Sequence, residues 1–147
     1  MRLIVQRVSE ASVSIDHQIH AQIGQGYLIY VGITNTDTVE EVEKLAYKIS
    51  GLRIFEDEQG KMNLNIDSVN GEILVVSQFT LYADMKRGHR PSFTKAADPH
   101  HAIPLYEKFI SLLSEKHQVQ AGVFGANMQI HSVNSGPVTI IYDTEDL

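Results

Sequence analysis

A short polar segment, Ser77-Gln78-Phe79-Thr80-Leu81, directly follows the apolar run Ile73 to Val76. The apolar run has the length of a buried strand, and a buried hydroxyl or amide is unfavourable unless it is paired. At the end of a strand, backbone N–H groups leave the ladder and become free to bind another group. Two such N–H groups could hold the oxyanion of an ester-cleaving transition state. The alternative is that the polar residues only terminate the strand and begin a turn.

A second segment, Asn134-Ser135-Gly136-Pro137-Val138-Thr139, separates two further apolar stretches. Glycine before proline allows backbone angles that other residues avoid, and an X-Pro bond can be cis at a cost of roughly 0.5–1 kcal/mol. Proline has no N–H and glycine has no side chain, so a rigid Gly136-Pro137 corner would present its carbonyl oxygens outward. These oxygens could accept hydrogen bonds from an ammonium group. A plain β-turn is the alternative.

Basic side chains gather in segment 84–95, which contains Lys86, Arg87, Arg90 and Lys95. The chain as a whole has a formal net charge of −6, and an acidic protein repels a polyanion at long range. A local basic segment can override that repulsion. This segment is therefore either a phosphate-binding element or a solvated loop.

Several common catalytic and ligand-binding patterns are missing from the sequence. It contains no G-x-S-x-G elbow, Walker loop, G-x-G-x-x-G turn or H-E-x-x-H helix, and it has no cysteine. His100-His101 is the one adjacent pair among seven histidines, and neighbours on a helix or strand point apart rather than toward one metal. We therefore expect no metal site and no cofactor.

The periodicity of apolar residues predicts the elements that position these segments. A capping-box pattern at Thr38 to Glu41 begins one helix, and Asp98-Pro99 begins a second helical region in which Pro104 is expected in the first turn. The predicted strands cover residues 1–8, 11–15, 19–23, 27–33, 53–55, 72–78, 119–124, 128–133 and 138–142. This order predicts an α+β domain with a strongly curved or two-layered, largely antiparallel β-sheet and two helices on one face.

Length and composition indicate a globular protein. A chain of 147 residues predicts one domain over 1–147, and such a domain can bury about 70% of its unfolded surface. Charge interrupts the N-terminal apolar stretch before it could act as a signal sequence, and no run approaches the ~18 apolar residues of a membrane span. We expect a cytoplasmic protein without a membrane partner.

Ser77 to Leu81 and the Gly136-Pro137 element together resemble the two signature motifs of D-aminoacyl-tRNA deacylases. The resemblance covers nearly the whole chain, and the order and spacing of its segments make it specific. The further matching segments are Gln6-Arg7-Val8, Ala11-Ser12-Val13, Arg53-Ile54-Phe55, Gly60 to Leu64, Arg90-Pro91-Ser92-Phe93 and Phe124-Gly125-Ala126 with Met128.

The resemblance implies a homodimer that cleaves D-aminoacyl-tRNA, and also glycyl-tRNA, at two active sites on the subunit interface. It implies a cis Gly-Pro peptide that reaches into the partner's pocket, where Gly136 and Pro137 grip the amino group and leave no room for an L side chain. Arg7 is similar to the arginine that braces this loop. The family commonly has Asp where this chain has Ser135, so we expect the loop to survive with weaker contacts to Arg7.

Under the same resemblance, Ser77 and Phe79 would line the pocket around the scissile ester, with Gln78 and Thr80 as the candidate catalytic residues. A Thr80 nucleophile would need a base, and Gln78 can orient water but cannot take its proton. The third option, in which the neighbouring ribose hydroxyl of the tRNA assists while backbone N–H groups hold the oxyanion, is how the family is understood. Two rival functions are an inert module that binds tRNA or a small amine, and a metal-dependent hydrolase.

Overall fold

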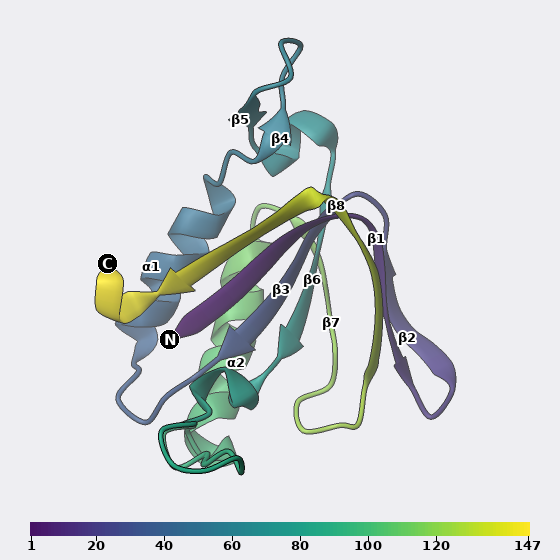
Figure 1. Cartoon of the computed structure of the whole chain (residues 1–147). Helices are drawn as coiled ribbons and strands as arrows, with labels where there is room; N and C mark the ends of the chain where they lie inside the picture. Colours follow the sequence, from purple (N-terminus) through teal and green to yellow (C-terminus); the bar gives the residue numbers. More distant parts are fainter.

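One long strand organises the main sheet of the computed structural model, which describes residues 1–147. β1 (Arg2–Ile15) pairs antiparallel with β2 (Gln18–Ile23), β3 (Gly26–Gly32) and β8 (Gln129–Asp143). The first half of β1 lies between β3 and β8, and its second half lies between β2 and β8. The sheet therefore bends along β1, as Figure 1 shows.

Beyond β3 the sheet continues with parallel strands, β6 (Glu72–Ser77) and β7 (Gln118–Ala121). The sheet is thus mixed, and the expected antiparallel pairing holds for the part around β1. Parallel neighbours need crossover connections, and these contain α1 (Val39–Ser50) and α2 (Pro99–Ser114). A small hairpin of β4 (Phe55–Glu56) and β5 (Met62–Leu64) projects from the first crossover (Figure 1).

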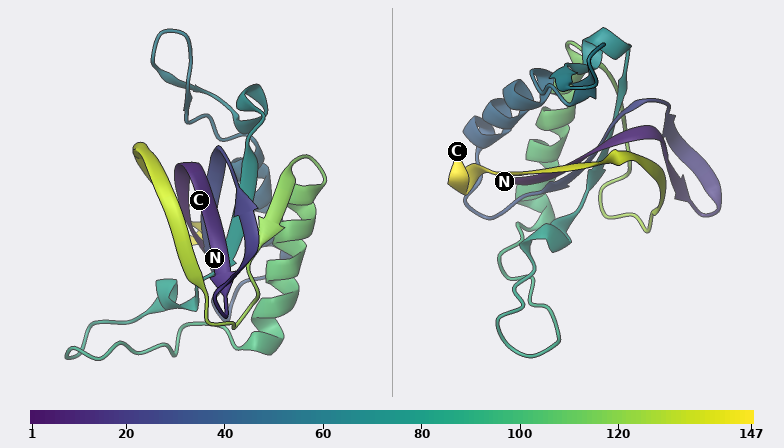
Figure 2. Two further views of the ribbon diagram at one scale, coloured as in Figure 1. Left: turned by 90° about the vertical axis from the view of Figure 1, so that its right-hand side faces the viewer. Right: turned by 45° about the horizontal axis from the view of Figure 1, so that its top comes forward.

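The two helices cover one face of the curved sheet, as predicted, and the right-hand view of Figure 2 shows this arrangement. Side chains of both helices form the larger apolar core with β1, β3 and β6. A second, smaller core fills the bend between the far half of β1, β2 and the other sides of β3 and β6. Because β1 contributes to both cores, its curvature follows from burying apolar side chains on opposite faces.

The helix boundaries follow the sequence signals with one exception. The capping box of Thr38 and Glu41 is present, and Asp98 caps α2. Pro104 is inside α2 rather than in its first turn, so that prediction was wrong. The residue lies on the exposed side of the helix, where water can satisfy the carbonyl group that loses its N–H partner.

The strand boundaries differ more from the prediction. Residues 1–8 and 11–15 form one strand, and residues 128–133 and 138–142 also form one strand, because β1 and β8 remain paired across the irregular segments between them. The predicted strand 53–55 shares only Phe55 with the observed strand β4, which has an unpredicted partner, β5. Three short 3-10 helices were also not predicted: η1 (Ile66–Val69), η2 (Phe79–Tyr82) and η3 (Thr144–Asp146). The chain has no helix with the length and apolar character that a membrane crossing needs.

Candidate active site

The predicted oxyanion segment lies at the end of β6, where the chain turns into η2. The N–H of Gln78 donates to the carbonyl of Val31 at 2.7 Å and so extends the parallel ladder by one residue. The N–H of Leu81 donates back to the carbonyl of Gln78 at 3.2 Å. The intervening N–H groups, of Phe79 and Thr80, begin the turn, where N–H groups have no partner within the helix.

The side chains of this turn restrain one another. The Gln78 amide donates to the hydroxyl of Thr80 at 2.5 Å. The Phe79 ring is 53% exposed and meets Phe93 edge to face, with ring centroids 5.0 Å apart. An amide cannot accept the proton of a hydroxyl near neutral pH. The contact with Gln78 therefore orients Thr80 without activating it as a nucleophile.

An open groove of about 260 Å³ lies beside the turn. Its lining consists of two segments, Val76 to Phe79 and Gly125 to Met128, together with Ile130. None of these side chains is a carboxylate, an imidazole or an amine. Asn127 and Ile130 were not predicted to belong to the site, and Met128 was part of the resemblance only. The one sequence signal for this side of the groove was that Gly125, Ala126 and Met128 belong to a matching segment.

Tyr106 of α2 lies behind the groove and lines a smaller apolar hollow with Ser77, Gln78 and Phe79. Its hydroxyl donates to the carbonyl of Val75 at 3.1 Å. Burial raises the pKa of Tyr106 to about 12. This phenol therefore stays protonated near neutral pH and cannot act as a general base there.

The Gly-Pro segment forms a large bulge in β8. Gln6 pairs with Thr139 and Val8 pairs with Asn134, so residues 135–138 of β8 face Arg7 alone on β1. The Asn134 side chain closes the bulge by accepting from the N–H of Val138 at 3.2 Å and donating to the hydroxyl of Thr139 at 3.1 Å. Gly136 and Pro137, joined by a cis peptide, are exposed at its tip.

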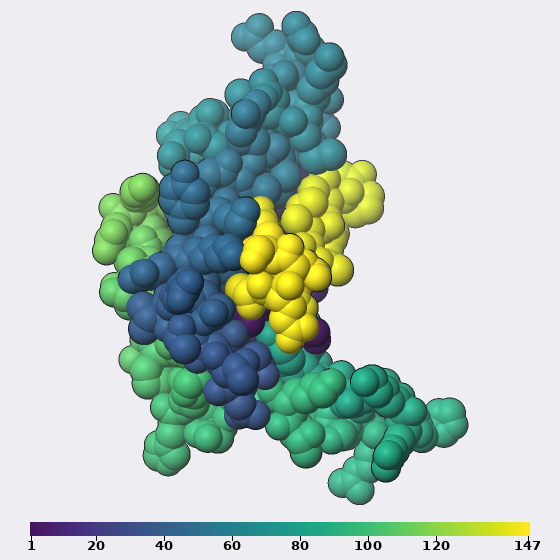
Figure 3. All heavy atoms as spheres, turned by 90° about the vertical axis from the view of Figure 1, so that its left-hand side faces the viewer, coloured from purple at the N-terminus to yellow at the C-terminus, as the bar shows by residue number.

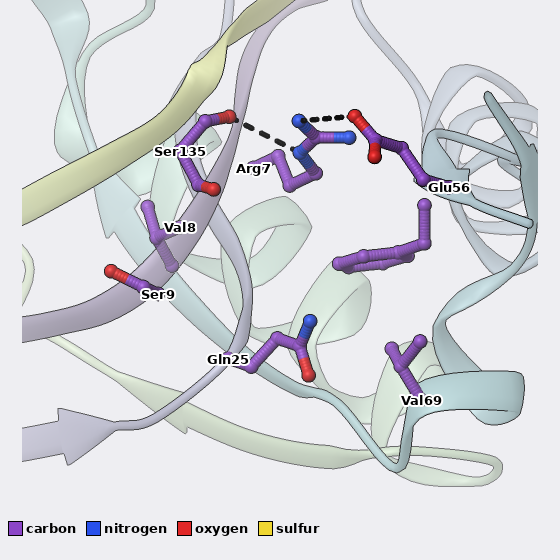
Figure 4. A pocket seen from close by; sticks show the side chains of 8 residues that line it. Arg7, Val8, Ser9, Gln25, Glu56, Val69 and Ser135 are labelled. Carbon is purple, nitrogen blue, oxygen red and sulfur yellow. Dashed lines mark hydrogen bonds and ion pairs between the residues drawn. The ribbon is translucent and has the colours of Figure 1, made fainter. Parts of the chain in front are cut away.

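Arg7 lies behind the bulge and is 8% exposed. Its Nε donates to the carbonyl of Ser135 at 3.1 Å, and its Nη1 donates to the carbonyl of Ile54 at 2.8 Å. Glu56 lies 3.9 Å from Nη2 across a cavity of about 280 Å³ (Figure 4). Since Arg7 binds the backbone of Ser135, this contact does not require the aspartate that is common at that position.

The two candidate segments lie at opposite ends of the sheet within one chain (Figure 1). Ser77 pairs with Val31, which pairs with Leu3 of β1, whereas the bulge faces Arg7. Strand geometry places them roughly 13 Å apart along the strands and roughly 14 Å apart across three strand steps. One chain therefore does not bring Ser77–Thr80 and Gly136-Pro137 together.

The predicted phosphate contacts Lys86, Arg87 and Arg90 are exposed in a loop that begins shortly after η2. Two backbone hydrogen bonds between Asp84 and Ser92, at 2.7 Å and 3.0 Å, close the base of the loop. The loop projects from the body of the molecule in Figures 2 and 3, where it is coloured teal to green. The structure brings no three His, Asp or Glu side chains together in a group that could hold a metal ion.

Comparison with known proteins shows which family the chain belongs to. A family model described as D-Tyr-tRNA(Tyr) deacylase matches residues 4–143. A D-aminoacyl-tRNA deacylase of Thermotoga petrophila is 55% identical and covers 100% of this chain and 99% of the relative. The D-aminoacyl-tRNA deacylase of Dictyoglomus turgidum is 54% identical, over 100% of this chain and 95% of the relative. A solved structure described as c-Myc DNA Unwinding Element Binding Protein has a TM-score of 0.92 and 38% identity, and the match covers 98% of this chain and 99% of that one. The chain is a member of the D-Tyr-tRNA(Tyr) deacylase family.

Proposed function

We propose that this protein hydrolyses the ester of D-aminoacyl-tRNA and releases the free amino acid and the tRNA. Family membership supports the reaction. The separation of the two motif segments within one chain is the observation on which the proposed site depends. Because Ser77–Thr80 and Gly136-Pro137 are at opposite ends of one sheet, we infer a homodimer with two active sites. Each site would combine Ser77–Thr80 from one subunit with Gly136-Pro137 of the partner subunit.

The catalytic step would depend on backbone groups and on the substrate. Water attacks the ester carbonyl, and the N–H groups of Phe79 and Thr80 hold the negative charge on its oxygen. The groove lining supplies no group that could accept a proton near neutral pH. The free hydroxyl beside the ester on the terminal ribose would assist proton transfer, and the tRNA leaves as the ribose alcohol. Gln78 orients water or Thr80 in this scheme.

Selection against L-aminoacyl groups would be steric. The exposed carbonyls of the partner's Gly136 and Pro137 would accept hydrogen bonds from the substrate ammonium group and so fix the α-carbon. One substituent position on that carbon then faces the bulge, and an L side chain would occupy it. Glycyl-tRNA has no side chain to reject, so we expect it to be a substrate as well.

The tRNA body would approach from the end of the sheet that holds η2, because Lys86, Arg87 and Arg90 project there. Phosphate contacts of this kind position a nucleic acid without reading its sequence. A tRNA substrate would also place the protein in the cytoplasm.

The deciding experiment compares purified protein on D-tyrosyl-tRNA, L-tyrosyl-tRNA and glycyl-tRNA. We expect release of tyrosine from the D ester, with the L ester preserved and glycyl-tRNA cleaved. Binding without turnover would support an inert tRNA-binding module, and equal release of D- and L-tyrosine would contradict the steric gate. A repeat in chelator separates a metal-dependent hydrolase, which would lose activity, from the mechanism above, which would not.

A further inference from the structure

The Arg2 side chain connects the end of β8 to the catalytic turn. Its Nε donates to Asp143 at 2.5 Å, and its Nη1 donates to the carbonyl of Leu81 at 3.1 Å. The guanidinium carbon lies 4.5 Å from the centroid of the Tyr82 ring. Leu81 and Tyr82 directly follow Thr80, so Arg2 contacts the second half of η2.

The C-terminal half of η2, which Arg2 contacts, also packs against β3. Leu81 rests on β3 where Gly32 has no side chain, since a Cβ on Gly32 would lie 2.9 Å from the Cβ of Leu81. The Tyr82 ring is buried, and burial raises the pKa of its hydroxyl, so the ring is neutral. Its face attracts a cation. The carbonyl of Leu81 is at the C-terminal end of the turn, where carbonyl groups have no partner within the helix.

A purely structural role for Arg2 would be to tie β1 to β8. Arg2 and Asp143 are already paired in register on those strands, and their side chains form the ion pair. The ion pair with Asp143 does not account for the contacts that the guanidinium makes with Leu81 and Tyr82 of η2. An arginine can bind a carboxylate and a carbonyl at once through its rigid fork, which a lysine ammonium cannot reproduce.

We propose that Arg2 is a positioning residue for the deacylation reaction, because it fixes η2 so that Ser77–Thr80 keep their place against the substrate. This inference rests on the proposed function. A displacement of about 1 Å in a catalytic segment can lower a rate about 100-fold. Loss of Arg2 should therefore reduce turnover more than substrate binding.

The test measures kcat and KM for D-tyrosyl-tRNA with Arg2→Met, Arg2→Lys and the control Arg53→Met. Arg53 also donates to a backbone carbonyl, that of Asn63 at 2.7 Å, but it lies on the hairpin segment far from η2. We expect Arg2→Met to lower kcat at least about tenfold, with KM within about threefold and with altered amide NMR shifts at Phe79 and Thr80. Arg2→Lys should give an intermediate kcat, and Arg53→Met should leave kcat and both amide signals unchanged.

The outcomes separate this inference from the proposed function. If the unaltered protein is inactive on D-tyrosyl-tRNA, both ideas fail. If it is active and Arg2→Met keeps kcat within about twofold, or loses activity only in proportion to unfolded protein, the positioning role alone is overturned. If Arg2→Met does not fold, Arg2→Lys decides: a kcat equal to that of the unaltered protein would refute the proposal.

Discussion

The two ends of the curved sheet hold the two proposed active-site segments in different ways. At one end, η2 rests on Gly32 and contacts Arg2, and its own side chains bond to one another. At the other end, the bulge of β8 stands out from the sheet, with Arg7 behind it and nothing of its own chain over Gly136 and Pro137. A segment that holds a transition state needs support within its own subunit, whereas a segment that enters a neighbour's pocket must protrude. The contrast fits a site made from both ends, one from each subunit.

The largest effect is expected at the tip of the bulge, from Gly136→Ala. Gly136 has φ of +125°, and a Cβ there would lie 2.8 Å from Nη2 of Arg7 and 3.0 Å from Val138. The positive φ strains an alanine, and either the Arg7 guanidinium that braces the bulge or the bulge itself must shift. A displacement of the bulge by about 1 Å should lower kcat/KM for D-tyrosyl-tRNA about 100-fold. Gly60→Ala is the matched control, because Gly60 also has positive φ but lies in open space on the hairpin. Equal activities of the two variants would show that the bulge is not part of the active site.

A smaller effect is expected from Arg7→Met, which removes the support behind the bulge. The carbonyl of Ile54 loses a buried hydrogen bond, so the free energy of unfolding should fall by about 2 kcal/mol. We expect kcat/KM to fall about tenfold, because the bulge stays closed by Asn134 but loses its anchor at Ser135. Urea denaturation and deacylation assays measure the two changes. An unchanged unfolding midpoint would contradict the role of Arg7 as a brace.

Thr80→Ala should have a still smaller effect, because the account assigns catalysis at the η2 end to backbone groups. The substitution removes the hydroxyl that accepts from Gln78 and keeps the N–H of residue 80. One lost hydrogen bond corresponds to about 1 kcal/mol, or roughly fivefold in kcat. Single-turnover kinetics gives the rate of the chemical step. A loss on the order of 10⁶, as seen when a true nucleophile is removed, would replace the backbone mechanism by a hydroxyl nucleophile.

The smallest effect concerns the end from which tRNA approaches. Reversing the charge at Lys86, Arg87 or Arg90 singly should weaken tRNA binding about threefold and lower the salt dependence of log K by about one. Lys61→Glu, in the hairpin at the other end, is the control and should change neither. Filter binding over a range of salt concentrations measures both quantities. If Lys61→Glu has the larger effect, tRNA enters from the opposite end.

Local sequence patterns predicted the strand that leads to η2, but not the bulge at the other end of the sheet. The change from Ile73–Val76 to Ser77–Thr80 marks the end of β6, because polar groups follow a buried strand. The capping box of Thr38 and Glu41, the Asp98-Pro99 helix start and the helical periodicity likewise predicted both helices, since these signals are local in the sequence. Local signals therefore predicted the end of β6 and the two helices, but not η2.

The bulge could not be predicted from any local sequence pattern. Its size depends on how Gln6 and Val8 pair with residues more than 120 positions away in the chain. Polar Ser9 and Glu10 looked like the end of a strand, although β8 keeps β1 continuous past them. No sequence pattern indicated a role for Arg2, because its contacts with Leu81 and Asp143 exist only in the folded chain.

Mixed dimers show whether each active site takes one segment from each subunit. Gly136→Ala damages the bulge, and Phe79→Pro removes one proposed oxyanion donor at the first position of η2, where proline is compatible with a helical turn. Each variant alone should be nearly inactive.

When equal amounts of the two variants are unfolded together and reassembled, half of the dimers should be mixed, and each mixed dimer has one intact site. We predict recovery of about a quarter of the activity of the unaltered protein. If the mixture is no more active than the average of the two variants, or if the unaltered protein is an active monomer, each chain contains its own complete site and the account is contradicted.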